Sequence, residues 1–405
     1  MLIRLYNLYT RYIHSNKMRI KVMKQLTIAI CMLTIMLSGF NSVEVHGATL
    51  KKFPSGLVLR GKAPGATSFC DLPRGEVDGG YCQIRWSDLE PVKGQFDYSL
   101  IDTAIQNARA YNSRNGISNN KGYKVLIRIR AGVHAPQWVK DRVGSIPWHF
   151  KNTTANQTHE LPLFWQGRYK TDYRNMMAAL ANRYDNNISV GAVSAAMCMT
   201  FHTEIMWNRT GRSEVRATNI ARMRNATNSA GRSMPYTNAK DFKCLQDQVN
   251  AHAVWQKTPT LFASHLYQEY DYSTGNASTS YNKAIQLFNF CRAQIGDRCV
   301  LGNNSLLHTE KATGGNIYQA LTQVGEPLYF QTHVFSNSGN KTFNFSNLKT
   351  AIRVGANFGG SIIELPIGWD CGNIYNKTNC TAALADSRSA ELANGRTLVK
   401  RNAFN

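Results

Sequence analysis

Eight short segments rich in apolar and β-branched residues recur from about residue 50 onward, and longer amphipathic segments separate them. The strand candidates cover residues 55–61, 81–86, 124–132, 190–201, 260–268, 298–305, 327–335 and 359–369. Strict alternation of strands and helices produces a parallel sheet, and eight such units are typical of a closed barrel. We therefore expect an α/β fold, a (β/α)8 TIM barrel with enlarged βα loops. A doubly wound open sheet is disfavoured because no Gly-rich phosphate loop follows the first strand candidate.

The segments between the strand candidates carry the helical period. In residues 97–112 the apolar side chains Ile101, Ile105 and Ala108 fall on one face of a helix, as in a helix that packs on a sheet. No internal repeat or low-complexity linker interrupts the pattern. One domain is therefore expected over residues 48–405.

The chain begins with a basic leader and a single apolar run at residues 26–40. This run is shorter than the roughly 20 residues that span a bilayer as a helix, and the small residues Gly47 and Ala48 offer a cleavage point. The pattern predicts a signal peptide over residues 1–47 and a secreted protein, with an uncleaved anchor as the alternative. No later segment is apolar enough for stable membrane insertion.

The net charge of +22 favours an anionic partner. The lysines and arginines are scattered, and no zinc-finger, helix-turn-helix or RNA-binding signature accompanies them, so nucleic acid is not expected as a partner. Acidic polysaccharides and anionic membrane surfaces remain as candidates.

Eight cysteines lie outside the predicted signal peptide, and an even number in a secreted chain suggests disulfides. Short loops favour the pairs Cys70–Cys82, Cys291–Cys299 and Cys371–Cys380, which leaves Cys198 with Cys244, although other pairings are open. No Cys or His spacing suggests zinc, and we expect neither a metal nor a cofactor. Eleven Asn-x-Ser/Thr sequons are compatible with a glycosylated surface.

Charged residues alternate with apolar ones in two of the strand candidates. Barrel strands turn one face to the helices and the other to the lumen with a period of two. The apolar positions of residues 124–132 must face the helices, which turns Arg128 and Arg130 inward, and the same rule turns Gln83 and Arg85 inward. A charged group in the interior needs a carboxylate partner. These arginines could therefore bind substrate, or they could form structural ion pairs.

Two glutamates lie at the strand ends where barrel active sites are built. Glu204 follows the fourth strand candidate and Glu364 ends the eighth, so they face each other across the mouth. Glycoside hydrolysis needs such a pair, one neutral acid and one ionised nucleophile or base. We expect Glu204 to hold the proton and Glu364, near the inward arginines, to be ionised. Loop carboxylates without a catalytic role are the alternative.

Tryptophan and polar residues cluster at the same predicted rim. Six of the seven tryptophans follow strand candidates, and aromatic faces pack well on the C–H faces of sugars. The candidate substrate-binding residues are Arg85, Trp86, Arg128, Arg130, Trp138, His202, Asn303, Gln331, His333, Trp369 and Asp370.

The stretches RWSDLEPVKGQFDYSLID (85–102) and KVLIRIRAGVHAPQWV (124–139) resemble the clan A glycoside hydrolases, in particular the β-galactosidase-like barrels of family 42. The resemblance implies that Glu204 is the acid/base residue, although Thr203 stands where the family usually has Asn. It places the nucleophile after strand seven, where this chain has Gln331 and His333 but no carboxylate. Glu90 is expected to shape the turn after strand two.

Three functions are compatible with these features. The first is a secreted glycoside hydrolase that cleaves an extracellular oligo- or polysaccharide with Glu204 and Glu364. The second is a catalytically inactive carbohydrate-binding barrel, which the missing carboxylate on strand seven favours. The third is a basic protein that binds anionic glycans or membranes through its charge.

Overall fold

The fold is seen in a computed structural model. It describes residues 49–60, 68–151, 158–206, 208–309, 316–333, 344–366 and 382–403. The predicted signal peptide, Trp207, Trp369, Asp370 and the Cys371–Cys380 pair lie outside these residues.

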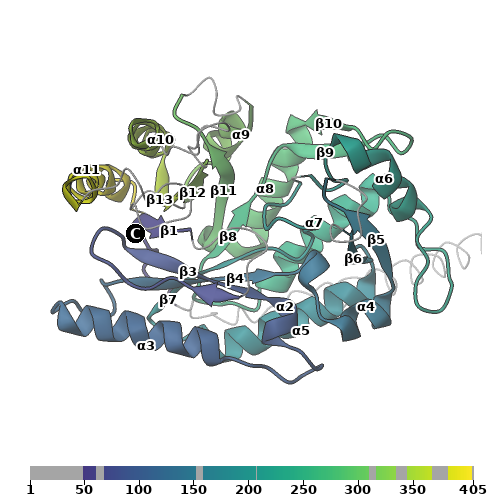
Figure 1. Cartoon of the computed structure of the whole chain (residues 1–405), viewed down its shortest axis with the longest axis horizontal. Coiled ribbons are helices and arrows are strands. Elements are labelled where there is room, and N and C mark those ends of the chain that lie inside the picture. Colours follow the sequence, from purple (N-terminus) through teal and green to yellow (C-terminus); the bar gives the residue numbers. More distant parts are fainter. Residues whose placement is uncertain are drawn as a thin grey trace, which may run out of the picture. The chain divides into compact units, whose positions relative to one another are not determined.

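Eight parallel strands form a closed barrel (Figure 1). They are β1 (Gly56–Leu59), β3 (Gly79–Arg85), β4 (Lys124–Arg130), β7 (Val190–Ser194), β8 (Thr260–Ala263), β11 (Cys299–Leu306), β12 (Leu328–Thr332) and β13 (Gly360–Leu365). Each strand pairs with the next one in this series, and pairing of β1 with both β13 and β3 closes the ring. The predicted TIM barrel is confirmed, and each strand coincides with one of the eight strand candidates.

Helices follow most of the barrel strands. They are α2 (Trp86–Leu89), α3 (Ser99–Arg114), α4 (Gln137–Val143), α5 (Gly167–Tyr184), α6 (Arg216–Arg224), α7 (Asn238–His252), α8 (Tyr281–Ile295), α9 (Asn316–Val324), α10 (Phe345–Asn357) and α11 (Ala382–Lys400). In α3 the predicted face is buried, with Ile101, Ile105 and Ala108 in the core. Enlarged loops after the third and fifth barrel strands carry the hairpins β5 (Ser145–His149) with β6 (Thr158–Pro162) and β9 (Tyr267–Tyr270) with β10 (Ala277–Ser280).

The connection between β1 and β3 departs from the expected alternation. Its described residues contain no helix, and the short strand β2 (Phe69–Cys70) pairs antiparallel with β3 instead. The last helix, α11, contacts β1 and β13 (Figure 1). Asp78 holds α11 in this place, because its carboxylate forms ion pairs with Arg396 at 2.5 Å and Lys400 at 2.6 Å. The same carboxylate accepts a hydrogen bond from the Leu57 amide at 3.2 Å.

The interior consists of two separate hydrophobic clusters. The larger lies between strands and helices and includes Val125, Ile127 and Ile129. The smaller fills the lumen and includes Tyr81, Leu126 and Tyr329 among its members. The period-two expectation for β4 is confirmed, since alternate residues of this strand belong to different clusters.

The turn after β3 is built around Glu90. Its carboxylate accepts hydrogen bonds from the Trp86 indole and from the Gly94 amide, both at 2.8 Å. Gly94 has a positive φ of 77°, a conformation that suits glycine. Asp97 accepts from the Ser99 amide at 2.9 Å, at the start of α3. This network explains the Glu-Pro-x-x-Gly sequence structurally, as expected.

Three disulfides lie within the described residues, Cys70–Cys82, Cys198–Cys244 and Cys291–Cys299. All three match the favoured pairings, and they are consistent with an oxidising compartment. None of the helices in the described ranges is long and apolar enough to cross a membrane.

We expect the Cys198–Cys244 disulfide to stabilise the fold more than Cys291–Cys299 does. The two bonds close sequence separations of 46 and 8 residues, and a longer loop loses more entropy in the unfolded chain, by about 1.5 kcal/mol here. Chemical unfolding of the two double Cys→Ser variants measures the difference. Equal losses of unfolding free energy would contradict this loop-length dependence.

Candidate active site

The carboxyl ends of the barrel strands form a mouth that brings together most of the described candidate residues. Glu204 follows β7 and Glu364 lies in β13. In the ring order, four steps separate β7 from β13 in either direction, so the two glutamates come from opposite sides of the barrel.

Glu364 belongs to an ion pair that crosses the lumen. The Arg128 guanidinium holds it in a bidentate arrangement, with Nη1 to Oε1 at 3.0 Å and Nη2 to Oε2 at 2.7 Å. The guanidinium also stacks on the ring of Tyr81, 3.6 Å from the ring centroid. In the amide orientation that satisfies both neighbours, Gln331 donates to Glu364 Oε1 at 3.1 Å and accepts from Arg60 Nε at 2.9 Å.

The ion pair leaves Glu364 no exposed surface. Burial lowers the pKa of Arg128, but the charge of Glu364, the hydrogen bonds to it and the neighbouring Tyr81 and Tyr329 together hold the pKa above its usual value. The structural alternative for the inward arginines therefore describes Arg128. To attack a sugar, Glu364 would first have to release an oxygen from Arg128.

Glu204 lies in a different environment at the rim. A parallel β-bridge between Ile205 and Ser264 extends the pairing of β7 and β8, and it fixes the position of the adjacent Glu204. The Oε1 atom of Glu204 lies 2.9 Å from His265 Nε2 and accepts a hydrogen bond from the backbone N–H of Asn304 at 3.1 Å. The residue is 8% exposed.

The proton distribution at Glu204 differs from the sequence expectation. Burial alone would raise its pKa, but the charge and hydrogen bond of His265 and the Asn304 amide lower the pKa below the usual 4.5. Burial lowers the pKa of His265, whereas the charge of Glu204 raises it, with a net rise above 6.5. Glu204 is thus held ionised, and the proton of the pair resides on His265.

A second group of mouth residues surrounds the ring of Phe201. Arg130 Nη2 donates to the Phe201 carbonyl at 3.3 Å, and its guanidinium lies 5.9 Å from the ring centroid. The rings of His202 and His134 lie 5.2 and 5.8 Å from Phe201, which stacks on Phe150 at 5.0 Å. Phe150 and Phe201 are partly exposed, so they offer aromatic surface at the mouth.

Gly132 allows the two loops that carry these groups to approach each other. Its φ is 54°, and a Cβ there would lie 2.2 Å from the Thr200 carbonyl oxygen. The Val133 amide donates to the same oxygen at 3.0 Å. A side chain at position 132 would force the loop before Phe201 away from the end of β4.

The tryptophans pack beneath the loops. Trp86 has no exposed surface and donates to Glu90, which leaves no face for a sugar. Trp138 is partly buried against the same core, and its indole donates to the Glu90 carbonyl at 3.0 Å. Trp148 and Trp165 are buried and donate to backbone carbonyls. In these residues the indole N–H anchors a loop, and Phe150 and Phe201 supply the exposed aromatic surface instead.

The remaining candidates divide between lumen, rim and core. Asn303 is fully buried and faces away from the lumen, where its amide donates to the Ser264 carbonyl at 2.9 Å and accepts from Tyr318. The next residue, Asn304, accepts from the lumen residue Tyr329 at 3.4 Å. His333 is exposed after β12, and Arg85 ends β3 at the mouth.

Sequence reasoning missed several residues of the mouth. His265 lies within the fifth strand candidate, two residues after the end of β8, but nothing in the sequence shows that it meets Glu204. Phe201 directly precedes the candidate His202, and its place after strand four was an available signal. Arg60 and Asn304 contribute through contacts that only the closed barrel creates.

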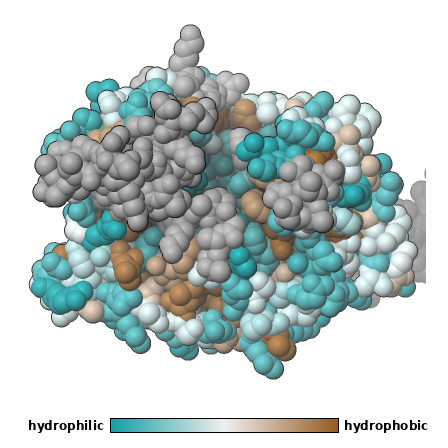
Figure 2. Space-filling view, in the orientation of Figure 1, coloured by the Kyte–Doolittle hydropathy of each residue, from teal (hydrophilic) through white to brown (hydrophobic). Residues whose placement is uncertain are grey.

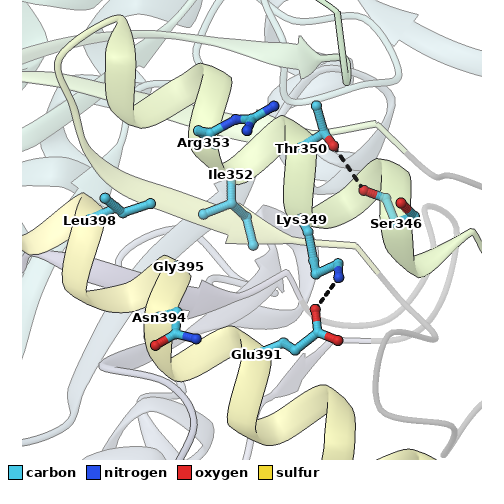
Figure 3. A pocket seen from close by; sticks show the side chains of 9 residues that line it. All are labelled: Ser346, Lys349, Thr350, Ile352, Arg353, Glu391, Asn394, Gly395 and Leu398. Carbon is cyan, nitrogen blue, oxygen red and sulfur yellow. Dashed lines mark hydrogen bonds and ion pairs between the residues drawn. The ribbon is translucent and has the colours of Figure 1, made fainter.

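No group of three or more His, Cys, Asp or Glu residues in the described ranges could hold a metal ion. A groove of about 370 Å³ lies outside the barrel between α10 and α11, where Lys349 pairs with Glu391 (Figure 3). The surface in Figure 2 shows hydrophobic residues in small patches among hydrophilic ones.

No protein-family model and no curated protein matches the chain. Similar solved structures include β-galactosidase from the psychrophilic Marinomonas ef1, with a TM-score of 0.45 and 13% identity over 79% of this chain and 54% of that one. Endo-glycoceramidase II from Rhodococcus sp. has a TM-score of 0.43 and 13% identity, over 84% and 80% of the two chains. D-psicose 3-epimerase from Clostridium cellulolyticum H10 has a TM-score of 0.39 and 9% identity, over 80% and 89%. The chain spans about half the length of that β-galactosidase.

We expect Glu364→Gln to lower the free energy of unfolding by about 3–5 kcal/mol, because it leaves a buried guanidinium without its counter-charge. Arg128→Gln should have a similar effect. The double variant should lose much less than the sum, since neither charge is then left alone. Denaturant unfolding of the three variants gives the coupling free energy, and additive losses would show that the pair is not coupled.

The contribution of the Glu204–His265 ion pair to the free energy of unfolding should decrease both at low pH and at high pH. Because the folded pKa of Glu204 is lowered, its contribution is lost as the pH falls through a value below 4.5. Because the folded pKa of His265 is raised, the contribution of this cation is present below 6.5 and is lost as the pH rises through the raised value. The difference in unfolding free energy between wild type and Glu204→Gln should therefore peak between these limits. A difference that does not change with pH would contradict this ion pair.

Proposed function

We propose that this chain is a secreted glycoside hydrolase that binds an oligo- or polysaccharide at the carboxyl ends of its barrel strands. The observation that carries the proposal is the environment of Glu204, a rim carboxylate held between the His265 imidazole and the Asn304 amide. Glycosidic cleavage needs a proton donor at the leaving oxygen. The Glu204–His265 pair carries one proton, which resides on His265 in the resting site, and the pair can deliver this proton as the general acid.

Hydrolysis also needs a second group to stabilise or attack the sugar carbon. Glu364 is the candidate, because it lies on the opposite strand and Arg128 neutralises its charge in the resting barrel. A negatively charged ligand could compete with Glu364 for Arg128. The positive charge that develops on the sugar in an oxocarbenium-like transition state could compete with Arg128 for Glu364. Either competition would change the pairing. Secretion fits the disulfides of the described residues and the predicted signal peptide.

A second function is favoured by the Arg128–Glu364 ion pair itself. Both oxygens of Glu364 face Arg128, and β12, the seventh strand of the barrel, carries no carboxylate. A barrel arranged in this way can bind sugars through its aromatic and polar mouth residues without cleaving them. This second candidate is a catalytically inactive carbohydrate-binding barrel.

Glu204→Gln should lower kcat by about 10²–10⁴-fold on the best substrate of a broad glycoside panel, because the variant removes the carboxylate of the pair that acts as the general acid. Glu269→Gln is the matched control, since Glu269 lies in β9 of a neighbouring loop and pairs with Lys283. This control should keep wild-type turnover. Product formation is followed by chromatography and folding by circular dichroism.

Three results of this experiment are informative. Near-normal turnover by Glu204→Gln would remove Glu204 from the mechanism. Wild-type protein that binds oligosaccharides but releases no product would support the inactive carbohydrate-binding barrel. Wild-type protein that neither binds nor cleaves any sugar of the panel would contradict both functions.

A further inference from the structure

Arg130 differs from the other arginines that are almost fully buried in the described residues. Arg128 is paired with Glu364, and Arg209 lies 3.2 Å from a carboxylate oxygen of Asp241. Arg130 is 5% exposed, yet no carboxylate of the described ranges lies within ion-pair distance of it. Its one hydrogen bond goes to the Phe201 carbonyl. Among the residues that the structure describes, the mouth therefore holds a buried positive charge without a carboxylate counter-charge.

The surroundings of Arg130 are electrostatically unfavourable for a cation. Burial, Arg85 and Arg128 together lower the pKa of Arg130 to about 10. The guanidinium nevertheless stays protonated at neutral pH. Because a buried charge is stable only when it is compensated, an anion in the mouth would relieve this cost.

Two histidines beside Arg130 have hydrogen-bonding capacity to spare. Burial, with Arg130 next, lowers the pKa of His134 to about 2, and burial lowers that of His202 to about 4. Both imidazoles are therefore neutral at physiological pH. The Nε2 atom of each is buried and has no hydrogen-bond partner among the described residues. Either ring can offer an N–H group to an acidic ligand.

The ring of Phe201 links these groups to an aromatic surface. Arg130, His134 and His202 all lie within 6 Å of this ring, at 5.9, 5.8 and 5.2 Å. Phe150 stacks on Phe201 with the ring centroids 5.0 Å apart, and its ring also lies 5.1 Å from that of His202. The apolar face of a sugar can pack on such rings while a substituent reaches the guanidinium.

We propose that the mouth selects sugars that carry a negative group, a carboxylate or a sulfate, and that Arg130 binds this group beside the rings of Phe201 and Phe150. The inference rests on the proposed carbohydrate function and names its substrate class. His134 and His202 donate to the same group. Bidentate pairing suits a guanidinium with either anion.

The test begins with binding of wild-type protein to an array of neutral, uronate-bearing and sulfated oligosaccharides. The best ligand is then titrated calorimetrically beside its own derivative, in which the carboxyl group is reduced to an alcohol or the sulfate is removed. The acidic form should bind roughly ten- to hundredfold more tightly, as expected for one charge-assisted contact. This comparison also distinguishes carboxylate from sulfate as the recognised group.

Arg130→Gln should abolish the preference, so that the acidic form binds no more tightly than its neutral derivative. Arg130→Lys should keep part of the preference, because the charge remains. Arg174→Gln, an exposed arginine in α5, is the control for net charge and should bind like wild type. Since Arg130 has no carboxylate partner in the described residues, Arg130→Gln should not lower the melting temperature.

The outcomes separate this inference from the proposed function. Equal affinity of wild type for acidic and neutral forms would overturn the selection of anionic sugars and leave the carbohydrate function standing. Tighter binding of the acidic form without any cleavage would support the selection and contradict the hydrolase. An unchanged preference in Arg130→Gln, or a melting temperature lowered as much as in Arg128→Gln, would assign Arg130 a structural role and overturn the inference.

Discussion

The bidentate ion pair between Arg128 and Glu364 sets the conditions for the whole mouth. It joins β4 to β13 through the lumen, above the apolar cluster that contains Leu126 and Tyr329. Two charges in such a place are tolerated because each satisfies the other, and Tyr81 covers the guanidinium from one side. The pair therefore separates an apolar lower lumen from a polar upper one.

This separation assigns different conditions to the two glutamates. Glu364 lies in the lumen and forms an ion pair with Arg128, whereas Glu204 lies at the rim and forms an ion pair with His265. With Glu364 engaged, the positive charge of Arg130 has no carboxylate in the described residues to offset it. The balance of charge in the mouth thus follows from one contact that lies below it.

The sequence predicted the barrel well because the signal is periodic. Alternation along β4 identified Arg128 and Arg130 as inward residues, since a strand turns every second side chain to one face. The same periodicity places Asn304, and not Asn303, toward the lumen, whereas Asn303 was expected as a hydrogen-bonding group at the rim. The order of the strand candidates also placed Glu204 after strand four.

The partners of these residues could not be predicted in the same way. Arg128 and Glu364 are 236 positions apart, and their contact depends on closure of the ring. The buried position of Trp86 depends on Glu90, whose carboxylate binds the indole in the folded turn. The state of Glu204 depends on His265 from the neighbouring strand end. Each is a tertiary contact that leaves no periodic trace in the chain.

The contacts of Asp78 with β1 and α11 have a consequence for folding of the chain during its synthesis. The Asp78 carboxylate accepts a hydrogen bond from the Leu57 amide in β1 and forms ion pairs with Arg396 and Lys400 in α11. These two cations lie more than 300 residues later in the chain than Asp78. On a ribosome, β1 emerges long before the helix that covers it, so the first strand must wait with its edge and apolar side chains uncovered. Contacts of such long range form slowly. The contacts of Asp78 with Arg396 and Lys400 can therefore form only after the last helix has been synthesised, so one aspartate joins the two ends of the fold late.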